Sequence, residues 1–233
     1  AQKIADKLVG VFRPDGEALG RLVRRRRGVD IARVAIWGDC GSFGYEFGTR
    51  RDQPLTIQEK ERWVPGAGEQ ATYIPAHEVL STYEGFLHAW EYRELAFDET
   101  VRDLCLKLNA TRIHGPAAGR VQDLQSLVDQ ALGGQTMKEG QRFYVKLGRA
   151  KTEAHLVAEG LRKLATIQYL IATGAFAPGG ILFWDEPEAN LNPVLIQKIE
   201  RLLFALVDSG MQVFVATHDY LLAHRLSLAA EKD

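Results

Sequence analysis

Apolar positions in the last third of the chain alternate between two spacings. Short continuous apolar runs, typical of buried strands, are separated by longer segments in which apolar residues recur every three or four positions, as on one side of a helix. In chain order these segments are an expected strand at 141–147, a helix at 161–172, a strand at 181–184, a helix at 193–207 and a strand at 211–216. Strands that alternate with helices predict a parallel sheet with crossover connections.

The first third of the chain has a different pattern. Residues 2–11 carry apolar positions at helical spacing with no capping residue in front of them, so we expect this helix to begin upstream of Ala1. Short alternating runs punctuated by glycines follow from residue 29 to about residue 75. Such runs predict an antiparallel meander.

The middle of the chain is helical in pattern, from Val79 to about Gly134. Asp98 is the expected N-cap of one helix in this region, and the pair Gly133-Gly134 is expected to end another. This region therefore reads as a helical insertion between the meander and the alternating segment.

Length and composition favour one large α/β domain with an insertion. The chain has 233 residues, of which 46% are hydrophobic, enough to bury a substantial core. We predict a single domain over residues 1–233. Its expected parts are the N-terminal helix and antiparallel β region (1–78), the helical insertion (79–140) and the alternating half (141–233).

Charge and cysteine content narrow the cellular setting. The formal net charge is -1, so no global field drives the chain onto nucleic acid or an anionic membrane. Cys40 and Cys105 are far apart and in no metal-binding spacing, which indicates a reducing compartment. No apolar run reaches the roughly 20 residues that span a bilayer. We expect a soluble cytoplasmic protein.

Two acidic residues follow the apolar run Ile181 to Trp184. The run is expected to be a central strand covered on both faces, so the acids lie at its carboxyl end. Successive residues of an extended chain point in opposite directions, and therefore Asp185 and Glu186 are expected to face different targets. Pro187 ends the strand because it lacks a backbone donor.

The helix after this strand has clear boundaries: Asn192 as N-cap, Pro193 in the first turn and Gly210 past its end. A right-handed crossover through this helix brings the next strand parallel to the first. The residues that follow it, Thr217 to Asp219, are then expected at the same sheet edge as Asp185 and Glu186.

The run DEPEANLNP (185–193) resembles the Walker B motif and D-loop of ABC-type ATPases, and VATHD (215–219) resembles their H-loop. The soluble RecF, SMC and OLD-like group is the most similar. The resemblance implies an α/β fold of the P-loop NTPase class, ABC-ATPase-like, with a mainly parallel sheet, an antiparallel β region and a helical insertion. It also implies ATP and Mg²⁺ as cofactors, with Asp185 on magnesium, Glu186 on the attacking water and His218 on the γ-phosphate.

The segment LVAEGLRKL (156–164) resembles the ABC signature, whose helix start presses on the γ-phosphate of ATP held by a second subunit. Gly160 matches the second glycine of that motif, and we assign Gly160 and Asn192 to nucleotide binding. Ala158 replaces the usual serine, and Glu159 brings a negative charge. Arg162 and Lys163 are expected to compensate this charge.

No GxxxxGK[ST] sequence occurs in the 233 residues, and the combination Gly148 to Thr152 lacks the required spacing. Either the loop lies upstream of Ala1, which we favour, or the protein has lost it. Because this loop makes most phosphate contacts, we expect the 233 residues alone to bind ATP with a dissociation constant no better than about 1 mM. Micromolar binding in a calorimetric titration contradicts this expectation.

Weaker features leave alternatives open. The basic run Arg24 to Arg27 suits either a nucleic-acid backbone or a solvated helix end, and the glycines between Gly38 and Gly48 suit hairpin turns.

The favoured function is an ATPase that forms a head-to-tail homodimer, away from membranes, in DNA repair, chromosome maintenance or phage defence, with nucleic acid or a nuclease or toxin as partner. The alternatives are a non-hydrolysing scaffold, or a nuclease that uses Asp185, Glu186 and Glu188 on metal.

Overall fold

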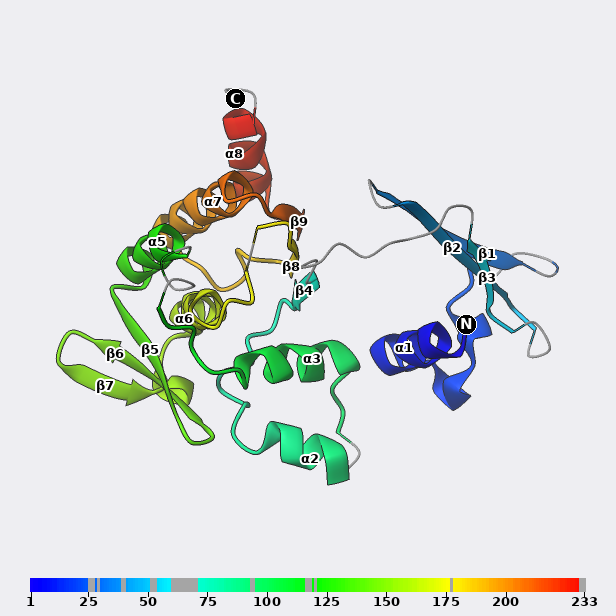
Figure 1. Cartoon of the computed structure of the whole chain (residues 1–233), viewed down its shortest axis with the longest axis horizontal. Coiled ribbons are helices and arrows are strands. Elements are labelled where there is room, and N and C mark those ends of the chain that lie inside the picture. Colours follow the sequence, from blue (N-terminus) through cyan, green and yellow to red (C-terminus); the bar gives the residue numbers. More distant parts are fainter. Residues whose placement is uncertain are drawn as a thin grey trace. The chain divides into compact units, whose positions relative to one another are not determined.

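The protein divides into two compact units (Figure 1). The computed structural model describes residues 1–24, 28, 30–38, 41–50, 54–59, 71–92, 95–115, 119, 121–176 and 178–230. The first unit comprises residues 1–67 with 96–99, and the second comprises residues 68–95 with 100–233. The predicted chemistry lies in the second unit.

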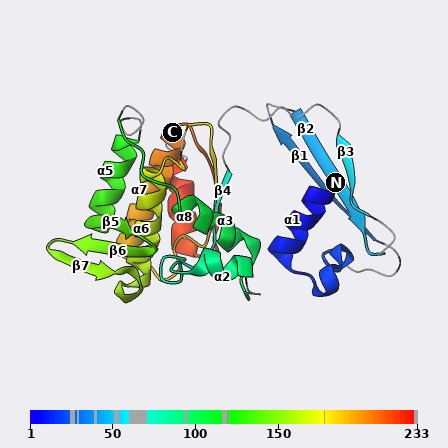
Figure 2. The same cartoon turned by 60° about the horizontal axis from the view of Figure 1, so that its bottom comes forward.

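The first unit is a three-stranded antiparallel sheet with short helices. Its elements are α1 (Gln2–Phe12), the 3-10 turns Asp15–Glu17 and Leu19–Arg21, β1 (Ile31–Gly38), β2 (Gly41–Gly48) and β3 (Thr56–Glu59). The strand order is β1-β2-β3, and β1 pairs with β2 antiparallel, with Gly38 opposite Gly41. The apolar side of α1 packs on a small core formed by Val23, Phe47 and Leu55 (Figure 2). The predicted helix and antiparallel strands are confirmed for these residues, and the expected hairpin turn at residues 39 and 40 lies outside the described residues.

One strand of the predicted meander region belongs elsewhere. Residues Ala71–Ile74 form β4, which pairs in parallel with β8 (Ile181–Asp185) in the second unit. The antiparallel region was therefore predicted too long. Alternation of apolar residues identifies a strand but carries no information about a partner strand more than 100 residues away.

The central sheet of the second unit has the order β4-β8-β9, and both pairings are parallel. The strand β9 (Gln212–Ala216) follows α7 (Pro193–Asp208), as predicted for a crossover. The prediction that β8 is covered on both faces is wrong for the described residues. Leu182 and Trp184 are buried, whereas Phe183 is 40% exposed and stacks on Phe214 of β9 on the other face.

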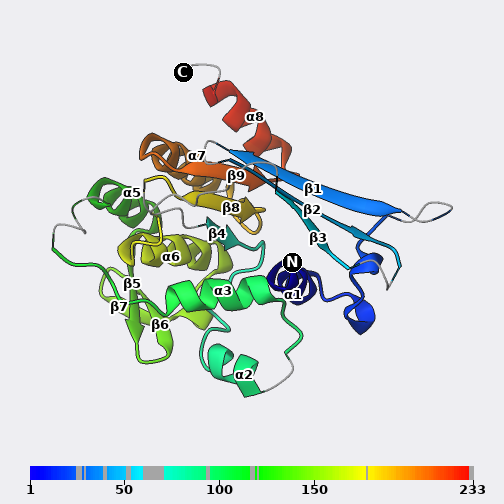
Figure 3. The same ribbon diagram turned by 45° about the vertical axis from the view of Figure 1, so that its right-hand side comes forward.

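Helices make up much of the rest of the second unit. They are α2 (Phe86–Tyr92), α3 (Glu99–Leu108), α5 (Gln122–Leu132), α6 (Glu159–Ala172), α7 and α8 (Tyr220–Ala230), with a 3-10 turn at Ala154–Leu156. Figure 3 shows α5, α6 and α7 gathered beside the strands. The predicted position of Asp98 just before α3 and the left-handed Gly133 after α5 are confirmed. Within the described part of the chain, none of the helices has both the length and the apolar character that a membrane crossing requires.

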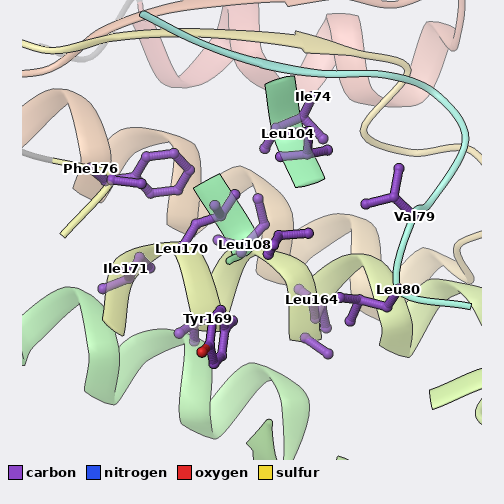
Figure 4. Close-up of a cluster of buried hydrophobic side chains, with 14 of the residues drawn as sticks. Ile74, Val79, Leu80, Leu104, Leu108, Leu164, Tyr169, Leu170, Ile171 and Phe176 are labelled. Atoms are coloured by element: carbon purple, nitrogen blue, oxygen red, sulfur yellow. The ribbon is translucent and has the colours of Figure 1, made fainter. Parts of the chain in front are cut away.

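The helix α6 forms the centre of the main core. Every residue from Lys163 to Ala172 is buried, so the helix is enclosed on all sides and not only along the predicted apolar stripe. Figure 4 shows Leu164, Leu170 and Ile171 from α6 among side chains from α3 and from the segment after β4. A helix in this position has its first turn held tightly against the neighbouring loops.

The run 141–147 does not join the parallel sheet. It forms β6 (Arg142–Leu147), which lies between β5 (Gly134–Glu139) and β7 (Ala150–Glu153) in a separate antiparallel sheet. The predicted parallel strand is therefore wrong, and β5 shortens the predicted helical insertion. Gly148, the first residue of the stretch with a remote likeness to a phosphate loop, has φ +59° in the hairpin turn between β6 and β7.

Candidate functional site

The carboxyl edge of the parallel sheet gathers the predicted site residues. Asp185, the last residue of β8, lies opposite Ala216, the last residue of β9. The segments that follow these two strands therefore leave the sheet side by side, as Figure 3 shows for the strands themselves. This is the arrangement that the crossover predicted, since ligand sites of parallel sheets lie beyond the carboxyl ends of the strands.

Asp185 and Glu186 have different partners. The hydroxyl of Tyr73, on β4, donates a hydrogen bond to Oδ2 of Asp185 at 3.4 Å. The carboxylate Oε1 of Glu186 lies 3.1 Å from Nδ1 of His218, with side-chain exposures of 37% for Glu186 and 78% for His218. The two neighbouring acids thus have separate partners, and the Glu186–His218 pair is accessible to a ligand from solvent.

Glu186 has an unusual backbone conformation. Its φ is +45°, in the left-handed region that residues other than glycine rarely adopt. Both adjacent peptide groups are held: the Glu186 N–H donates to Ala216 O at 2.8 Å, and the Glu186 carbonyl accepts from the Ala189 N–H at 3.1 Å. Such a conformation costs on the order of 1–3 kcal/mol and persists only where surrounding bonds impose it. Backbone strain of this kind is often found at functional sites.

Glu188 links the two segments that leave the sheet. Its side chain is buried, and Oε1 accepts a hydrogen bond from Thr217 Oγ1 at 2.5 Å. Thr217 Oγ1 in turn accepts from the Asp219 N–H at 3.0 Å, and Asp219 Oδ1 caps α8 by accepting from the Leu222 N–H. These bonds fix the position of His218, which lies between Thr217 and Asp219.

The first turn of α6 packs closely on the loop after β8. A Cβ atom on Gly160 would lie 2.6 Å from Leu191 Cδ2 and 3.1 Å from Asn190 O, so only glycine fits there without a shift. Ala158 occupies the N-cap without a side-chain hydrogen bond. The charge of Glu159 is engaged by Asn190, whose Nδ2 donates to Glu159 Oε1 at 2.8 Å. Nucleotide binding by Gly160 stays a prediction.

Of the two predicted counter-charges to Glu159, Arg162 pairs with another carboxylate, whereas Lys163 does interact with the charge of Glu159. Arg162 forms an ion pair with Glu78, Nε to Oε1 2.7 Å, and the two side chains are only 16% and 5% exposed. Lys163 is 4% exposed, and its ammonium donates to the carbonyl oxygen of Glu186 at 3.1 Å. Burial lowers the pKa of Lys163, while nearby carboxylates, including that of Glu159, oppose this effect.

Sequence reasoning missed the roles of Tyr73 and Lys163. A signal for Lys163 was present, because it lies three residues after Gly160 and one before Leu164, in phase with the apolar stripe of α6. A lysine on the buried side of a helix is rarely there without a partner. Tyr73 had no comparable signal, since its contact with Asp185 depends on the pairing of β4 with β8.

The remaining predicted residues have these positions. Asn192 caps α7, with Oδ1 accepting from the Leu195 N–H at 2.9 Å, which confirms the cap. Its contact with nucleotide stays a prediction. Arg25 to Arg27 of the basic run and Cys40 lie outside the described residues.

The donor set at this edge suits the magnesium of a nucleotide. Mg²⁺ prefers oxygen ligands and is held by one or two carboxylates together with phosphates and water. Among the described residues no group of three or more His, Cys, Asp or Glu side chains is arranged to hold a metal by itself. The carboxylate of Asp185, oriented by Tyr73, is a ligand of the kind that a nucleotide-borne Mg²⁺ requires.

Comparison with known proteins identifies similar chains. The model of a family described as "AAA domain, putative AbiEii toxin, Type IV TA system" matches residues 50–223.

Among solved structures, the SMC head domain from Thermotoga maritima is 16% identical, with 84% of this chain and 67% of that chain covered and a TM-score of 0.45. An SMC head bound to the C-terminal winged-helix domain of ScpA is 12% identical, with 95% and 79% covered and a TM-score of 0.48. An ATP-binding cassette, solved as a dimer with ADP and Pi, is 16% identical, with 77% and 65% covered and a TM-score of 0.31. No curated protein matches the chain significantly in sequence.

Proposed function

Since the chain belongs to the family of AAA domains described as putative AbiEii toxins of type IV toxin–antitoxin systems, we propose that the carboxyl edge of its β4-β8-β9 sheet supplies the magnesium-binding and water-orienting part of a site that binds and hydrolyses ATP. Members of this family are ATPases of the P-loop class. The observation that carries the proposal is the convergence of Asp185, Glu186 and His218 at the ends of two adjacent parallel strands.

The roles of the three residues follow from chemistry and position. Glu186 orients the attacking water and accepts its proton, because a carboxylate held beside the reacting phosphate is the group that such hydrolysis requires. His218 lies 3.1 Å from Glu186 and is 78% exposed, so it can reach a terminal phosphate while holding the carboxylate in place. Asp185, with Tyr73 donating to it, would hold the magnesium ion, which offsets phosphate charge when bound.

We further propose that two copies close head-to-tail around ATP, with the first turn of α6 from one copy facing the phosphate in the other. The amides at the start of a helix favour an anion. Hydrolysis would then drive a conformational change. The resemblance to the RecF, SMC and OLD-like group suggests a setting in DNA maintenance or phage defence for this change, and the family description names a toxin–antitoxin system.

Magnesium dependence is the direct test. The full-length protein is expected to release phosphate from ATP with Mg²⁺ and to lose at least tenfold in rate when EDTA removes the ion, because the phosphate charge is then not offset. Phosphate release is measured by a coupled assay. A non-hydrolysing scaffold predicts no release in either condition, and a nuclease predicts cleavage of plasmid DNA with Mg²⁺ and without ATP; either result contradicts the proposal.

A further inference from the structure

The Lys163 side chain joins the helix α6 directly to the backbone of Glu186 through a hydrogen bond described above. Its ammonium donates to the Glu186 carbonyl oxygen at 3.1 Å, and the side chain is 4% exposed. A lysine is almost never buried without a compensating partner. The residue therefore occupies its position at an energetic cost that packing alone does not explain.

The acceptor of this bond is the peptide that determines the direction of the Glu186 side chain. With φ at +45°, Glu186 is in a conformation that its neighbours must impose. Its carbonyl accepts two hydrogen bonds, one from the Ala189 N–H within the same loop and one from Lys163. Of these two bonds to the carbonyl, the one from Lys163 comes from another element of the fold, the helix α6.

The surroundings of the ammonium are strongly acidic. Burial lowers the pKa of Lys163, and the carboxylates of Glu159, Glu188, Glu186 and Asp185 act in the opposite direction. Glu159 precedes Lys163 on α6, and the other three follow β8. A positive charge here reduces the mutual repulsion of carboxylates that would otherwise push Asp185 and Glu186 apart.

We propose that Lys163 is a positioning residue for ATP hydrolysis, which holds the Glu186 turn so that the Glu186 carboxylate stays directed at His218. The inference rests on the proposed function, and it adds a residue of the α6 helix to the machinery at the sheet edge. Lys163 acts through Glu186 and touches no reacting atom. Loss of its donor leaves the Glu186 carbonyl with the bond from Ala189 alone, while the Glu186 N–H keeps its bond to Ala216 O, and we expect the carboxylate then to leave its place beside His218.

The chain offers a matched control. Lys198, on α7, also donates from Nζ to a backbone carbonyl, that of Ala131, at 2.8 Å, and this bond joins α7 to α5 and not to the turn of Glu186. Lys163→Met and Lys198→Met each remove one such bond and keep the aliphatic stem. Both are compared in the full-length protein, with circular dichroism and thermal melting to establish folding.

Steady-state kinetics separate a positioning role from a structural one. We expect Lys163→Met to lower kcat for ATP by about 10- to 100-fold with KM changed by less than about threefold, and Lys198→Met to change both by less than about twofold. In a Glu186→Gln background, Lys163→Met should cause no further loss in single-turnover hydrolysis, because it acts through Glu186. Lys163→Arg, which keeps a charged donor, should restore part of the lost rate.

A second readout needs no nucleotide. The ring signals of His218 in the NMR spectrum, assigned with His218→Asn, should move in Lys163→Met in the same direction as in Glu186→Gln, and stay in place in Lys198→Met. If Lys163→Met does not fold, Lys163→Gln replaces it with the same criteria.

Three results overturn the inference: kcat within twofold of the wild type, a loss that adds in full to that of Glu186→Gln, or unmoved His218 signals. If the wild type hydrolyses ATP and any of these three results is found, the role of Lys163 is excluded and the proposed function stands. An absence of hydrolysis in the wild type removes the proposed function and the inference with it.

Discussion

Replacing Glu186 with glutamine is expected to lower the rate of ATP hydrolysis by about 10²- to 10⁴-fold, the range that a positioned general base contributes. The amide keeps the shape of the side chain but can no longer accept the proton of the attacking water. Nucleotide binding should persist, because Asp185 and Tyr73 are untouched. The variant should therefore stay longer in the ATP-bound dimer, which light scattering with ATP and Mg²⁺ detects as a higher molar mass.

Glu139→Gln is the matched control for this substitution. Glu139 lies on β5, exposed to solvent, and pairs with Lys151 at 2.6 Å, away from the sheet edge. Its replacement should leave turnover within about twofold of the wild type, since exposed ion pairs contribute little. Wild-type turnover in Glu186→Gln would exclude Glu186 as the base, and a loss of ATP binding in that variant would point to a structural role for the residue.

The unit β8-α7-β9 could be predicted because its signals are local. An apolar run ended by acids and Pro187, an N-cap at Asn192 and a glycine at 210 each act within a few residues. The handedness of crossovers then supplied the one long-range relation, the parallel pairing of β8 with β9. With these in place, the proximity of His218 and Glu186 followed without further information.

The parts that could not be predicted depend on pairing between distant segments. β4 pairs with β8 across more than 100 residues, and this pairing alone brings Tyr73 to Asp185. β6 has the apolar pattern of a buried strand, yet hairpin turns at Gly140 and Gly148 direct it into an antiparallel sheet. Periodicity identifies the face of a strand that is buried but not the strand beside it.

The exposed face of the central sheet shows another limit of sequence patterns. A continuous apolar run predicts cover on both sides. Here Tyr73, Phe183 and Phe214 lie in register across the three strands, and each is partly exposed, at 38%, 40% and 45%. An apolar residue can be buried, but its apolar character does not identify the segment that covers it.

Shortening Leu170 to alanine is expected to lower the free energy of unfolding by about 2–5 kcal/mol, the cost typical of a large-to-small substitution in a close-packed core. Leu170 is fully buried in α6 among the side chains shown in Figure 4. The loss combines removed apolar contacts with the cavity left behind, because a helix enclosed on all sides cannot collapse into the gap. Urea unfolding followed by circular dichroism measures the change.

Leu228→Ala provides the comparison within a helix, since Leu228 is 46% exposed on α8. Its cost should be within about 0.5 kcal/mol, as for most surface substitutions. A loss below about 1 kcal/mol for Leu170→Ala would mean that the core around α6 rearranges to fill the space. In that case α6 would not be held rigidly enough to explain the tight contact between Gly160 and the Asn190–Leu191 loop.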